Sequence, residues 1–264
     1  MADPTFSIIT VSYNEEATIA STLQSILGQR WEGKELIVVD GQSNDGTLAE
    51  VGRFLPFIHH FRSEPDRGLY DAMNKGLELA SGDYVCFMNA GDRFHASDVL
   101  ERIAGAAGDA TVVLFGRARI RSERGEHLNP GPHERPGDWL GRGFPSHQAT
   151  FYPRRFAEHA RYDMALGTAA DTDYSLRAIA ACGWQFVDVV VCDFALGGIS
   201  NRLANWREAV STSRHRWQVW RRHVGQFQPG FVPKYLGGPI AGWMLKTVFG
   251  QNALTWMRHR LGSR

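Results

Sequence analysis

The segment from Glu64 to Asp92 constrains the fold more than any other part of this sequence. It contains, in order, a charged loop, a helical pattern, a turn, an apolar run and an acidic residue. Four apolar residues of the helical pattern recur on one face: Leu69, Met73, Leu77 and Ala80. Residues 84–88 are continuously apolar, which is typical of a strand covered on both faces. The segment therefore predicts a helix followed by a buried strand.

The chain before this segment repeats the same alternation. Apolar runs at residues 6–11 and 35–40 are expected to be strands, and residues 57–62 are expected to be a third. Residues 19–27 form a helical face between the first two runs, and Thr47 begins a short helix after the second. This alternation predicts an α/β fold, with a Rossmann-like, mostly parallel sheet, flanking helices and right-handed crossovers.

Polar side chains stand where the predicted strands end. Asp40 ends the second strand, and Asn89 and Asp92 follow the strand at residues 84–88. Ligands of open α/β sheets bind at the carboxyl ends of the strands, so we expect these side chains to line a ligand crevice. Two structural alternatives remain, because Asp40 could stabilise a turn and Asp92 could cap the helix that follows it.

The loop after the first strand argues against two classes of nucleotide-binding protein. Residues 12–16 read Ser-Tyr-Asn-Glu-Glu, so no G-x-G-x-x-G motif follows the strand, and no G-x-x-x-x-G-K-[ST] motif occurs anywhere. A dinucleotide-binding Rossmann enzyme and a P-loop NTPase are therefore disfavoured. The ring of Tyr13 and the carboxylate of Asp40 together suit a nucleobase, which one can stack upon and the other can bind by a hydrogen bond.

The rest of the first 200 residues continues the α/β pattern less regularly. Residues 96–107 predict a helix, residues 111–115 and 118–121 predict two paired strands, and residues 122–146 form a long loop rich in glycine and proline. Such a loop is either a lid or a plain surface insertion. Regular structure returns at residues 147–152, a helix is predicted from Asp171 to Gly183, a strand at residues 185–191 and a turn at residues 197–200.

The cysteines and the hydropathy pattern indicate a protein of a reducing compartment. Cys86, Cys182 and Cys192 are an odd number without C-x-x-C spacing, which argues against a disulfide framework or a zinc site. No apolar run reaches the roughly 18 residues of a membrane-spanning helix. The N-terminus has no positively charged region of the signal-peptide type. We therefore expect a cytoplasmic location, peripheral at the inner face of the membrane if the tail binds lipid.

Residues 201–264 differ from the body of the chain. They contain 11 Lys and Arg residues, one acid and five of the eight tryptophans, whereas residues 1–200 contain 18 Lys and Arg against 27 acids. A basic, Trp-rich helical extension suits an anionic membrane surface. The alternative is that its helices pack on the acidic body, and the two interpretations are equally weighted. Nucleic acid is disfavoured because the body is acidic.

Five motifs in matching order resemble those of the family 2 inverting glycosyltransferases, across residues 5–200. The motifs are Val-Ser-Tyr-Asn-Glu15, Val-Val-Asp40-Gly-Gln-Ser-Asn-Asp-Gly-Thr47, Gly-Leu-Tyr-Asp-Ala-Met-Asn-Lys-Gly76, Phe-Met-Asn-Ala-Gly-Asp92 and Ala-Asp171-Thr-Asp-Tyr. The resemblance is greatest to bacterial members that build exopolysaccharide, capsule or O-antigen. It implies a GT-A domain at residues 1–200, with a nucleotide-binding half at 1–92 and an acceptor half at 93–200, followed by the extension at 201–264.

The resemblance also implies roles for individual residues. Those expected to bind the nucleotide are Val11, Tyr13, Glu15, Asp40, Asp66 and Arg67. Asn89 and Asp92 would hold a divalent metal, Mn²⁺ or Mg²⁺, and Asp171 would be the general base, with Asp173 as the alternative acid. His147, Gln148 and Asp173 are further candidates for acceptor or diphosphate contacts.

Two departures from the family pattern affect these roles. Asn89-Ala-Gly-Asp92 stands where the family often has Asp-x-Asp-Asp, and Ala170 precedes Asp171 where the family has Glu. One carboxylate and one amide can still hold Mn²⁺ or Mg²⁺ if the diphosphate completes the coordination shell. The expected function is metal-assisted transfer of a sugar from a nucleotide donor, UDP-linked by preference, to a lipid-linked or polysaccharide acceptor. The alternative is a catalytically weak nucleotide-sugar-binding or membrane adaptor protein.

Overall fold

The computed structural model describes residues 3–108, 110–122, 125–130, 145–195, 206–223, 225, 236–238 and 240–241. Its first half follows the predicted alternation. The elements are β1 (Phe6–Ser12), α1 (Ile19–Leu27), β2 (Lys34–Asp40), α2 (Thr47–Gly52), η1 (Leu55–Phe57), β3 (His60–Ser63), α3 (Leu69–Leu79) and β4 (Tyr84–Phe87). β1 pairs in parallel with β2 and β4, and β2 pairs in parallel with β3. The predicted parallel α/β arrangement is confirmed for this half.

The second half completes a mixed sheet. Its elements are β5 (Arg93–Phe94), α4 (Val99–Ala104), β6 (Val113–Ser122), β7 (Gly125–Asn129), η2 (His147–Ala149), β8 (Thr150–Pro153), α6 (Arg154–Ala157), η3 (Met164–Ala169), α7 (Ala170–Cys182), β9 (Trp184–Ala195) and α8 (Trp206–Arg222). The strand order is β3-β2-β1-β4-β8-β6-β9-β5, and β7 pairs with β6. β8 runs antiparallel to β4, so the beginning of β8 meets the end of β4.

Two predictions for the second half are wrong. Residues 111–115 and 118–121 do not pair with each other, because both belong mainly to the single strand β6. A Cβ atom on Gly116 would lie 2.6 Å from the carbonyl oxygen of Val189, so only glycine lets β6 pass β9 here. Residues 125–129, which fall within the predicted loop, form β7. The remainder of that loop at 131–144, the turn at 197–200 and the tail tryptophans Trp243 and Trp256 lie outside the described residues.

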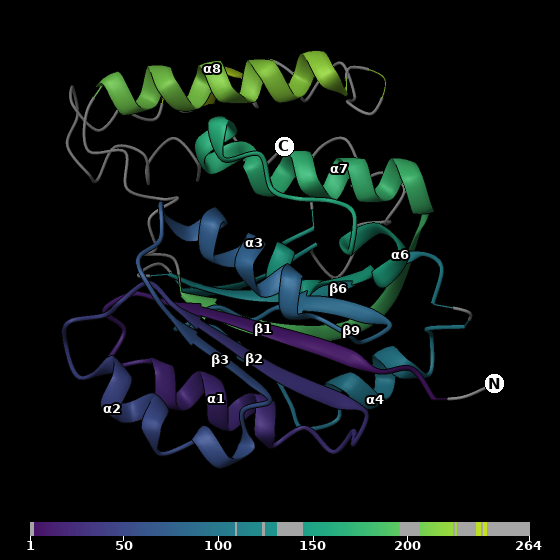
Figure 1. Cartoon of the computed structure of the whole chain (residues 1–264). Coiled ribbons are helices and arrows are strands. Elements are labelled where there is room, and N and C mark those ends of the chain that lie inside the picture. The colour runs from purple at the N-terminus through teal and green to yellow at the C-terminus, as the bar shows by residue number, and fades with distance from the viewer. Residues whose placement is uncertain are drawn as a thin grey trace.

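Helices cover both faces of the sheet (Figure 1). α1, α2 and α4 pack on one face, where Phe6, Leu23 and Ile103 belong to one buried apolar cluster. α3 and α7 pack on the other face, in a cluster that includes Met73, Tyr174 and Val219 of α8. α8 lies across the outer side of this second layer (Figure 1). The continuous apolar strands predicted from the sequence are thus buried on both faces, as parallel strands usually are.

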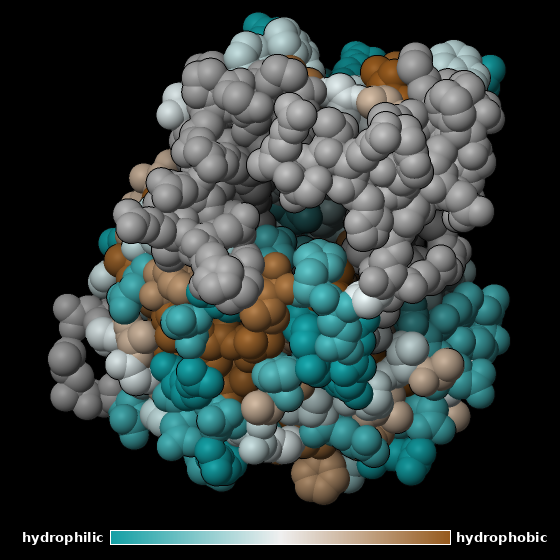
Figure 2. All heavy atoms as spheres, turned by 180° about the vertical axis from the view of Figure 1, so that it is seen from behind, coloured by the Kyte–Doolittle hydropathy of each residue, from teal (hydrophilic) through white to brown (hydrophobic). Residues whose placement is uncertain are grey.

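The surface of the described residues is mixed in character. Seen from behind, hydrophilic side chains surround a central hydrophobic patch (Figure 2). Among the helices that the structure describes, none has the length and apolar character needed to cross a bilayer.

Candidate active site

The site lies at the edge of the sheet where β1, β2 and β4 end. Asn89 and Asp92 follow β4, and His147 and Gln148 belong to the turn η2 that enters β8. The side-chain amide of Gln148 donates a hydrogen bond to Asp92 Oδ2 over 3.2 Å. Asn89 Nδ2 and His147 Nε2 are 3.3 Å apart, and His147 Nδ1 is 3.7 Å from Asp171 Oδ2. Two residues expected only as weak candidates therefore contact the predicted site: His147 lies between Asn89 and Asp171, and Gln148 contacts Asp92.

The carboxyl group of Asp92 is the most perturbed acid of this network. Burial raises its pKa to about 6, and the negative charge of Glu15 acts in the same direction. The nearby His147 and the hydrogen bond from Gln148 oppose the rise but do not cancel it. A carboxylate that is costly to ionise gains from a bound cation, because the cation compensates its charge.

The local atoms fit a divalent metal only with help from a substrate. Asn89 Oδ1 is buried and has no hydrogen-bond partner, so this oxygen is available to a hydrogen-bond donor or a cation. Asp92 supplies a second oxygen. Among the described residues, no group of three His, Cys, Asp or Glu side chains could hold a metal. Mn²⁺ and Mg²⁺ accept substrate phosphates and water as the remaining ligands, so the oxygens of Asn89 and Asp92 are chemically compatible with a metal held jointly with a diphosphate.

Asp171 lies in the first turn of α7, at the helix end where backbone N–H groups favour a negative charge. Its Oδ1 accepts a hydrogen bond from the Thr172 backbone over 2.6 Å, and its side chain is 33% exposed. Tyr70 lies against it: burial and then the charge of Asp171 raise the pKa of Tyr70 well above its usual value. Asp171 is thus a carboxyl group that remains open to a ligand on one side.

Two residues of the predicted nucleotide side, Tyr13 and Asp66, lie against Gly41. A Cβ atom on Gly41 would lie 2.3 Å from Asp66 Oδ2 and 3.3 Å from Tyr13 Cδ2. The Tyr13 side chain is 59% exposed, so its ring is free to stack on a base. Val11 of β1 is buried, and its carbonyl accepts a hydrogen bond from the Ala90 backbone. Tyr13 and Asp66 therefore form an open, aromatic and acidic wall.

Asp40 is held differently from the other predicted nucleotide ligands. It is fully buried, and its two oxygens accept hydrogen bonds from Ser12, Ser43 and Ser63 side chains and from the Ser43 backbone. These bonds tie the end of β2 to β1, to β3 and to the loop that follows β2. These contacts are the ones that the turn-stabilising alternative for Asp40 requires, and its contact with a nucleotide stays a prediction.

Glu15 and Arg67 occupy the rim of the site. The Glu15 carboxylate accepts a hydrogen bond from Thr18 over 2.6 Å, and its backbone N–H donates to Thr47 over 2.7 Å. Its charge reaches Asp92, as the pKa of that group indicates. Arg67 is 75% exposed and donates to Asp71 of α3 over 2.8 Å. A contact from Arg67 to a nucleotide would require it to leave Asp71.

Asp173 is placed away from this network. Its side chain is only 1% exposed, and both oxygens are engaged, by Arg177 on one side and by Arg222 and His223 on the other. Burial opposes its ionisation, but the hydrogen bonds from His223 and Arg177 prevail and lower its pKa to about 2. An acid with no open side is a poor acceptor contact, so the structure argues against that role and against Asp173 as the alternative base.

A second polar cluster, next to β5, was not predicted from the sequence. Asp193 of β9 is buried, accepts two hydrogen bonds of 2.7 Å from Arg119 and lies 2.9 Å from His95. Arg93, which directly follows Asp92, is 3.6 Å from the same carboxylate. The alternation of arginines at 117, 119 and 121 in β6 was the one available signal for a polar strand face.

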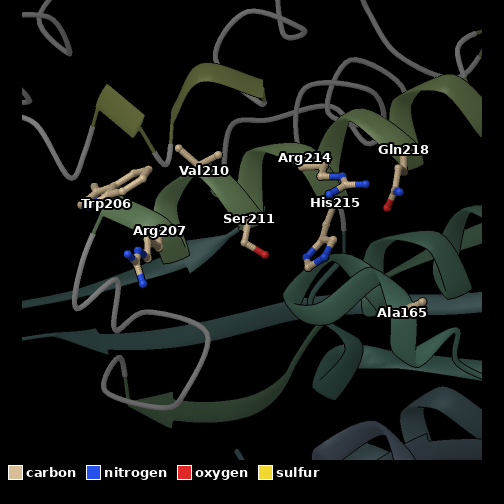
Figure 3. Close-up of a pocket in the computed structure, with 8 residues that line it drawn as sticks. All are labelled: Ala165, Trp206, Arg207, Val210, Ser211, Arg214, His215 and Gln218. Carbon is tan, nitrogen blue, oxygen red and sulfur yellow. The ribbon is translucent and has the colours of Figure 1, made fainter.

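A groove of about 550 Å³ lies between α8 and η3, apart from the predicted site residues (Figure 3). Its lining comes from one face of α8 and from Ala165: Trp206, Arg207, Val210, Ser211, Arg214, His215 and Gln218. None of the residues predicted to bind the donor lines it, so the groove is separate from the predicted nucleotide site.

Comparison with known proteins gives consistent relatives. Residues 7–163 match the family model described as glycosyl transferase family 2. The chain is 34% identical over 204 residues to the uncharacterized glycosyltransferase Rv1514c of Mycobacterium tuberculosis, covering 75% of this chain and 78% of that protein. It is 32% identical over 214 residues to a PGL/p-HBAD biosynthesis glycosyltransferase of Mycobacterium bovis, covering 78% of this chain and 82% of that protein.

Two solved structures share the fold at low sequence identity. S. aureus TarS 1–349 in complex with UDP-GlcNAc superposes with a TM-score of 0.64 at 15% identity, covering 94% of this chain and 74% of that chain. The mannosyltransferase PcManGT of Pyrobaculum calidifontis, in complex with GDP-Man and Mn²⁺, superposes with a TM-score of 0.64 at 18% identity, covering 99% and 81%.

Proposed function

This chain belongs to glycosyl transferase family 2, and from that premise we propose that it is an inverting enzyme that moves a sugar from a UDP-linked donor to a lipid-linked or polysaccharide acceptor in bacterial glycan biosynthesis. The α/β class and the GT-A fold expected from the sequence are confirmed, as is an enzyme of glycosyl transfer. This activity disfavours the adaptor alternative. The inversion, the nucleotide and the acceptor are proposed here.

The observation that carries the proposal is the set of contacts at the end of β4, where Gln148 donates to Asp92 and His147 lies between Asn89 and Asp171. This arrangement places a diphosphate-binding end and a proton-accepting end at the mouth of β4. An inverting displacement needs these two functions on opposite sides of the sugar. The acceptor hydroxyl oxygen bonds to the anomeric carbon, the bond from that carbon to the diphosphate breaks, and the hydroxyl proton passes to Asp171.

The residues of the chain divide the work of this step. Asn89 and Asp92 would hold Mn²⁺ or Mg²⁺, which supplies neutralisation of the charge that develops on the departing diphosphate. His147, 3.7 Å from Asp171 and 3.3 Å from Asn89, would keep the carboxylate oriented toward the acceptor side. Tyr13 and Asp66 would receive the nucleobase and ribose. No covalent intermediate is needed, so a single acid can serve as the base.

Donor binding can be tested by heat denaturation. With Mn²⁺ present, we expect UDP to raise the melting temperature, because a ligand that binds only the folded state stabilises it by mass action. The shift should exceed that with GDP or dTDP at equal concentration, should fall strongly in EDTA and should be lost in Tyr13→Ala. Phe57→Ala, which removes an equally exposed ring from η1, is the matched control and should keep the full shift. Equal shifts with all three nucleotides would contradict a UDP donor.

We propose in addition that α8 docks on the inner face of an anionic membrane, where a lipid-linked acceptor resides. Residues at positions i, i+4, i+8, i+11 and i+15 of the helix share one face: Trp206, Val210, Arg214, Trp217 and Arg221. Trp206 is 53% exposed and Trp217 is 45% exposed. Large apolar side chains between arginines are typical of a helix lying in an anionic lipid interface. Val219, on the opposite side of α8, is buried against the body, and Trp206, Val210 and Arg214 also line the open groove beside η3.

Vesicle sedimentation tests the membrane proposal. The full chain should pellet with vesicles of phosphatidylglycerol and phosphatidylcholine but not with phosphatidylcholine alone. Replacing Trp206 and Trp217 by Ala and Arg214 and Arg221 by Gln should weaken binding at least roughly tenfold, since each arginine near the surface contributes about 1 kcal/mol. The matched control is Leu55→Ala with Phe57→Ala, which removes exposed apolar side chains from η1. Equal pelleting of both variants would exclude this face as the docking surface.

A further inference from the structure

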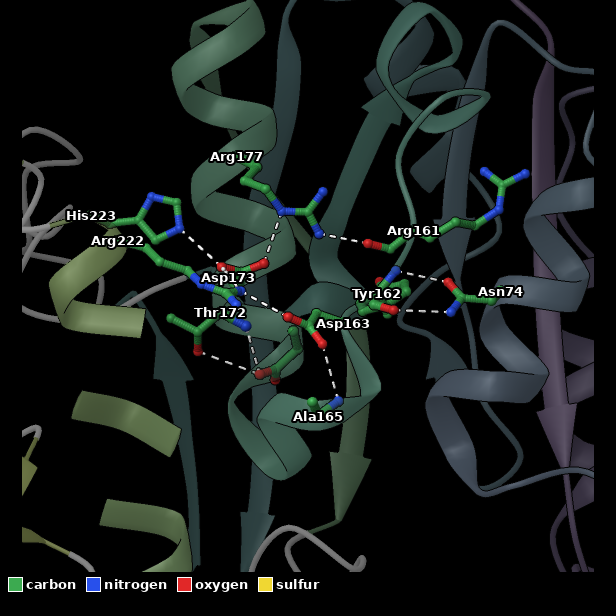
Figure 4. Close-up of polar contacts among 11 residues, drawn as sticks. Asn74, Arg161, Tyr162, Asp163, Ala165, Thr172, Asp173, Arg177, Arg222 and His223 are labelled. Carbon is green, nitrogen blue, oxygen red and sulfur yellow. Dashed lines mark hydrogen bonds and ion pairs between the residues drawn. The ribbon is translucent and has the colours of Figure 1, made fainter. Parts of the chain in front are cut away.

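The segment at residues 163–173, which presents Asp171, is held between two helices (Figure 4). On one side, the Asn74 side chain of α3 makes two hydrogen bonds with the Tyr162 backbone, of 3.0 and 2.8 Å. The Tyr162 ring stacks on Tyr174 of α7 with ring centroids 4.2 Å apart. On this side, therefore, the segment is fixed to the body of the enzyme.

On the other side, the same segment is held by α8. Arg222 donates to Asp163 Oδ2 over 2.9 Å and lies 3.4 Å from Asp173 Oδ1. His223, just beyond the helix end, is 3.0 Å from the same oxygen of Asp173. One arginine thus spans both ends of the segment, with Asp163 before η3 and Asp173 in α7. These three side chains and His223 are the α8 clamp.

A third contact lies between the two ends of the segment. Gly167 has φ of +49°, and a Cβ atom there would lie 2.7 Å from His215 Nδ1 of α8. The imidazole therefore rests directly on the backbone at the kink within η3, just before α7 begins. Figure 3 shows His215 pointing from α8 toward η3. Because α8 touches the segment before, within and after η3, movement of α8 changes the place from which α7 starts.

The electrostatics of the α8 clamp favour a fixed position. The Asp173 carboxylate is buried, and it receives Arg177 of its own helix over 2.8 Å as well as the two α8 residues. Arg177 also donates to the Arg161 carbonyl over 2.6 Å. Removal of one partner from a buried and fully engaged carboxylate is costly, since its charge then lacks compensation. The clamp therefore has one strongly preferred geometry.

We propose that Asp173, Arg222 and His223 are positioning residues for the general base, so that α8 is part of the catalytic apparatus in addition to any role at a membrane. The inference rests on the proposed function in one respect, which is that Asp171 is the general base. Asp171 is two residues from Asp173 on α7, and its distance to His147 depends on where the first turn of that helix sits. Loss of the clamp lets this turn shift relative to η2, which contributes His147.

A double-mutant cycle tests the proposal. Arg222→Ala should lower kcat about tenfold with little change in the KM for the donor, and Arg222→Lys should recover most of the loss. Arg53→Ala breaks an ion pair with Glu50 at an arginine that is 65% exposed, and it should leave kcat within about twofold. In the Asp171→Asn background, Arg222→Ala should add almost nothing, because residues that act through one another are not additive. An undiminished tenfold loss in that background would overturn the positioning role.

Hydrogen–deuterium exchange provides a reading that does not depend on activity. Arg222→Ala should speed exchange in peptides spanning residues 163–175, whereas Arg53→Ala should not, and peptides of β1 and β2 should be unchanged in both. Unchanged exchange at residues 163–175 would overturn the proposal whatever the kinetics. If Asp171→Asn itself retains full turnover, the proposed base has failed, and the exchange result alone then decides whether α8 positions this segment.

Discussion

Replacing Asp171 by Asn is expected to lower the turnover number by at least about 100-fold, which is the lower end of what a positioned general base contributes. Asparagine keeps the shape of the side chain and its place beside His147, but it cannot accept the hydroxyl proton. Donor binding should change little, because Tyr13, Asp66, Asn89 and Asp92 are untouched. The measurement is steady-state transfer with Mn²⁺ and a saturating donor, together with the melting shift produced by UDP.

The control for this variant is Asp188→Asn, which removes a carboxylate that is 76% exposed on β9. It should retain turnover within about twofold. Turnover of Asp171→Asn at the wild-type level would remove Asp171 from the mechanism. Loss of turnover together with loss of the UDP shift would instead point to a role for Asp171 in donor binding.

Replacing Asp92 by Asn is expected to abolish metal-dependent transfer and to make the metal-free protein more stable above pH 6. Asp92 is the only carboxylate of the proposed metal pair, so its loss leaves two amides, which bind Mn²⁺ weakly. Burial makes ionisation of the wild-type carboxyl group costly and raises its pKa to about 6. Each pKa unit corresponds to about 1.4 kcal/mol, so the neutral amide should stabilise the fold by roughly 2–3 kcal/mol above pH 6. For a chain of this size that is a rise in Tm of several degrees.

The pH dependence of this gain has a definite sign. The pKa of Asp92 lies near 3.8 in the unfolded chain and about 6 in the folded protein. Below pH 3.8 the wild-type protein therefore has no ionisation cost at Asp92. Its stability falls as the pH rises from 3.8 toward 6 and is constant above that. The difference in Tm between variant and wild type, measured in EDTA, should accordingly be small at pH 4 and largest at pH 7 and above. A gain that is equal at both pH values would show that the ionisation of Asp92 is not its cause.

The strands and the edge at which the site assembles follow directly from the sequence. Continuous apolar runs and the turn residues between them predict β1, β2 and β4, and chain direction then brings Tyr13, Asn89 and Asp92 to one edge. These are local signals, and parallel pairing leaves few alternatives. The helix that carries Asp171 was predicted for the same reason, from its apolar spacing and its end at Gly183.

The partners of each acid could not be predicted in this way. Asp40 and Asp171 both precede polar, turn-forming or helix-starting residues, yet the first is closed off by three serines and the second remains a third exposed. The contacts of Asp173 with Arg222 and His223 join residues about 50 positions apart, and no spacing rule encodes such a contact. The continuity of β6 through Gly116 depends on the nearness of β9, which is equally non-local.

The reversed direction of β8 has a consequence for how this site can vary. In a wholly parallel sheet, every group at the ligand edge comes from chain that has just left a strand. Here His147 and Gln148 come from chain that is about to enter one, because β8 runs against β4. The residues that contact Asn89, Asp92 and Asp171 from this side therefore lie on a separate length of polypeptide from the strand ends of β1, β2 and β4. Exchange of the residues that lead into β8 would alter these contacts while leaving the parallel strands intact.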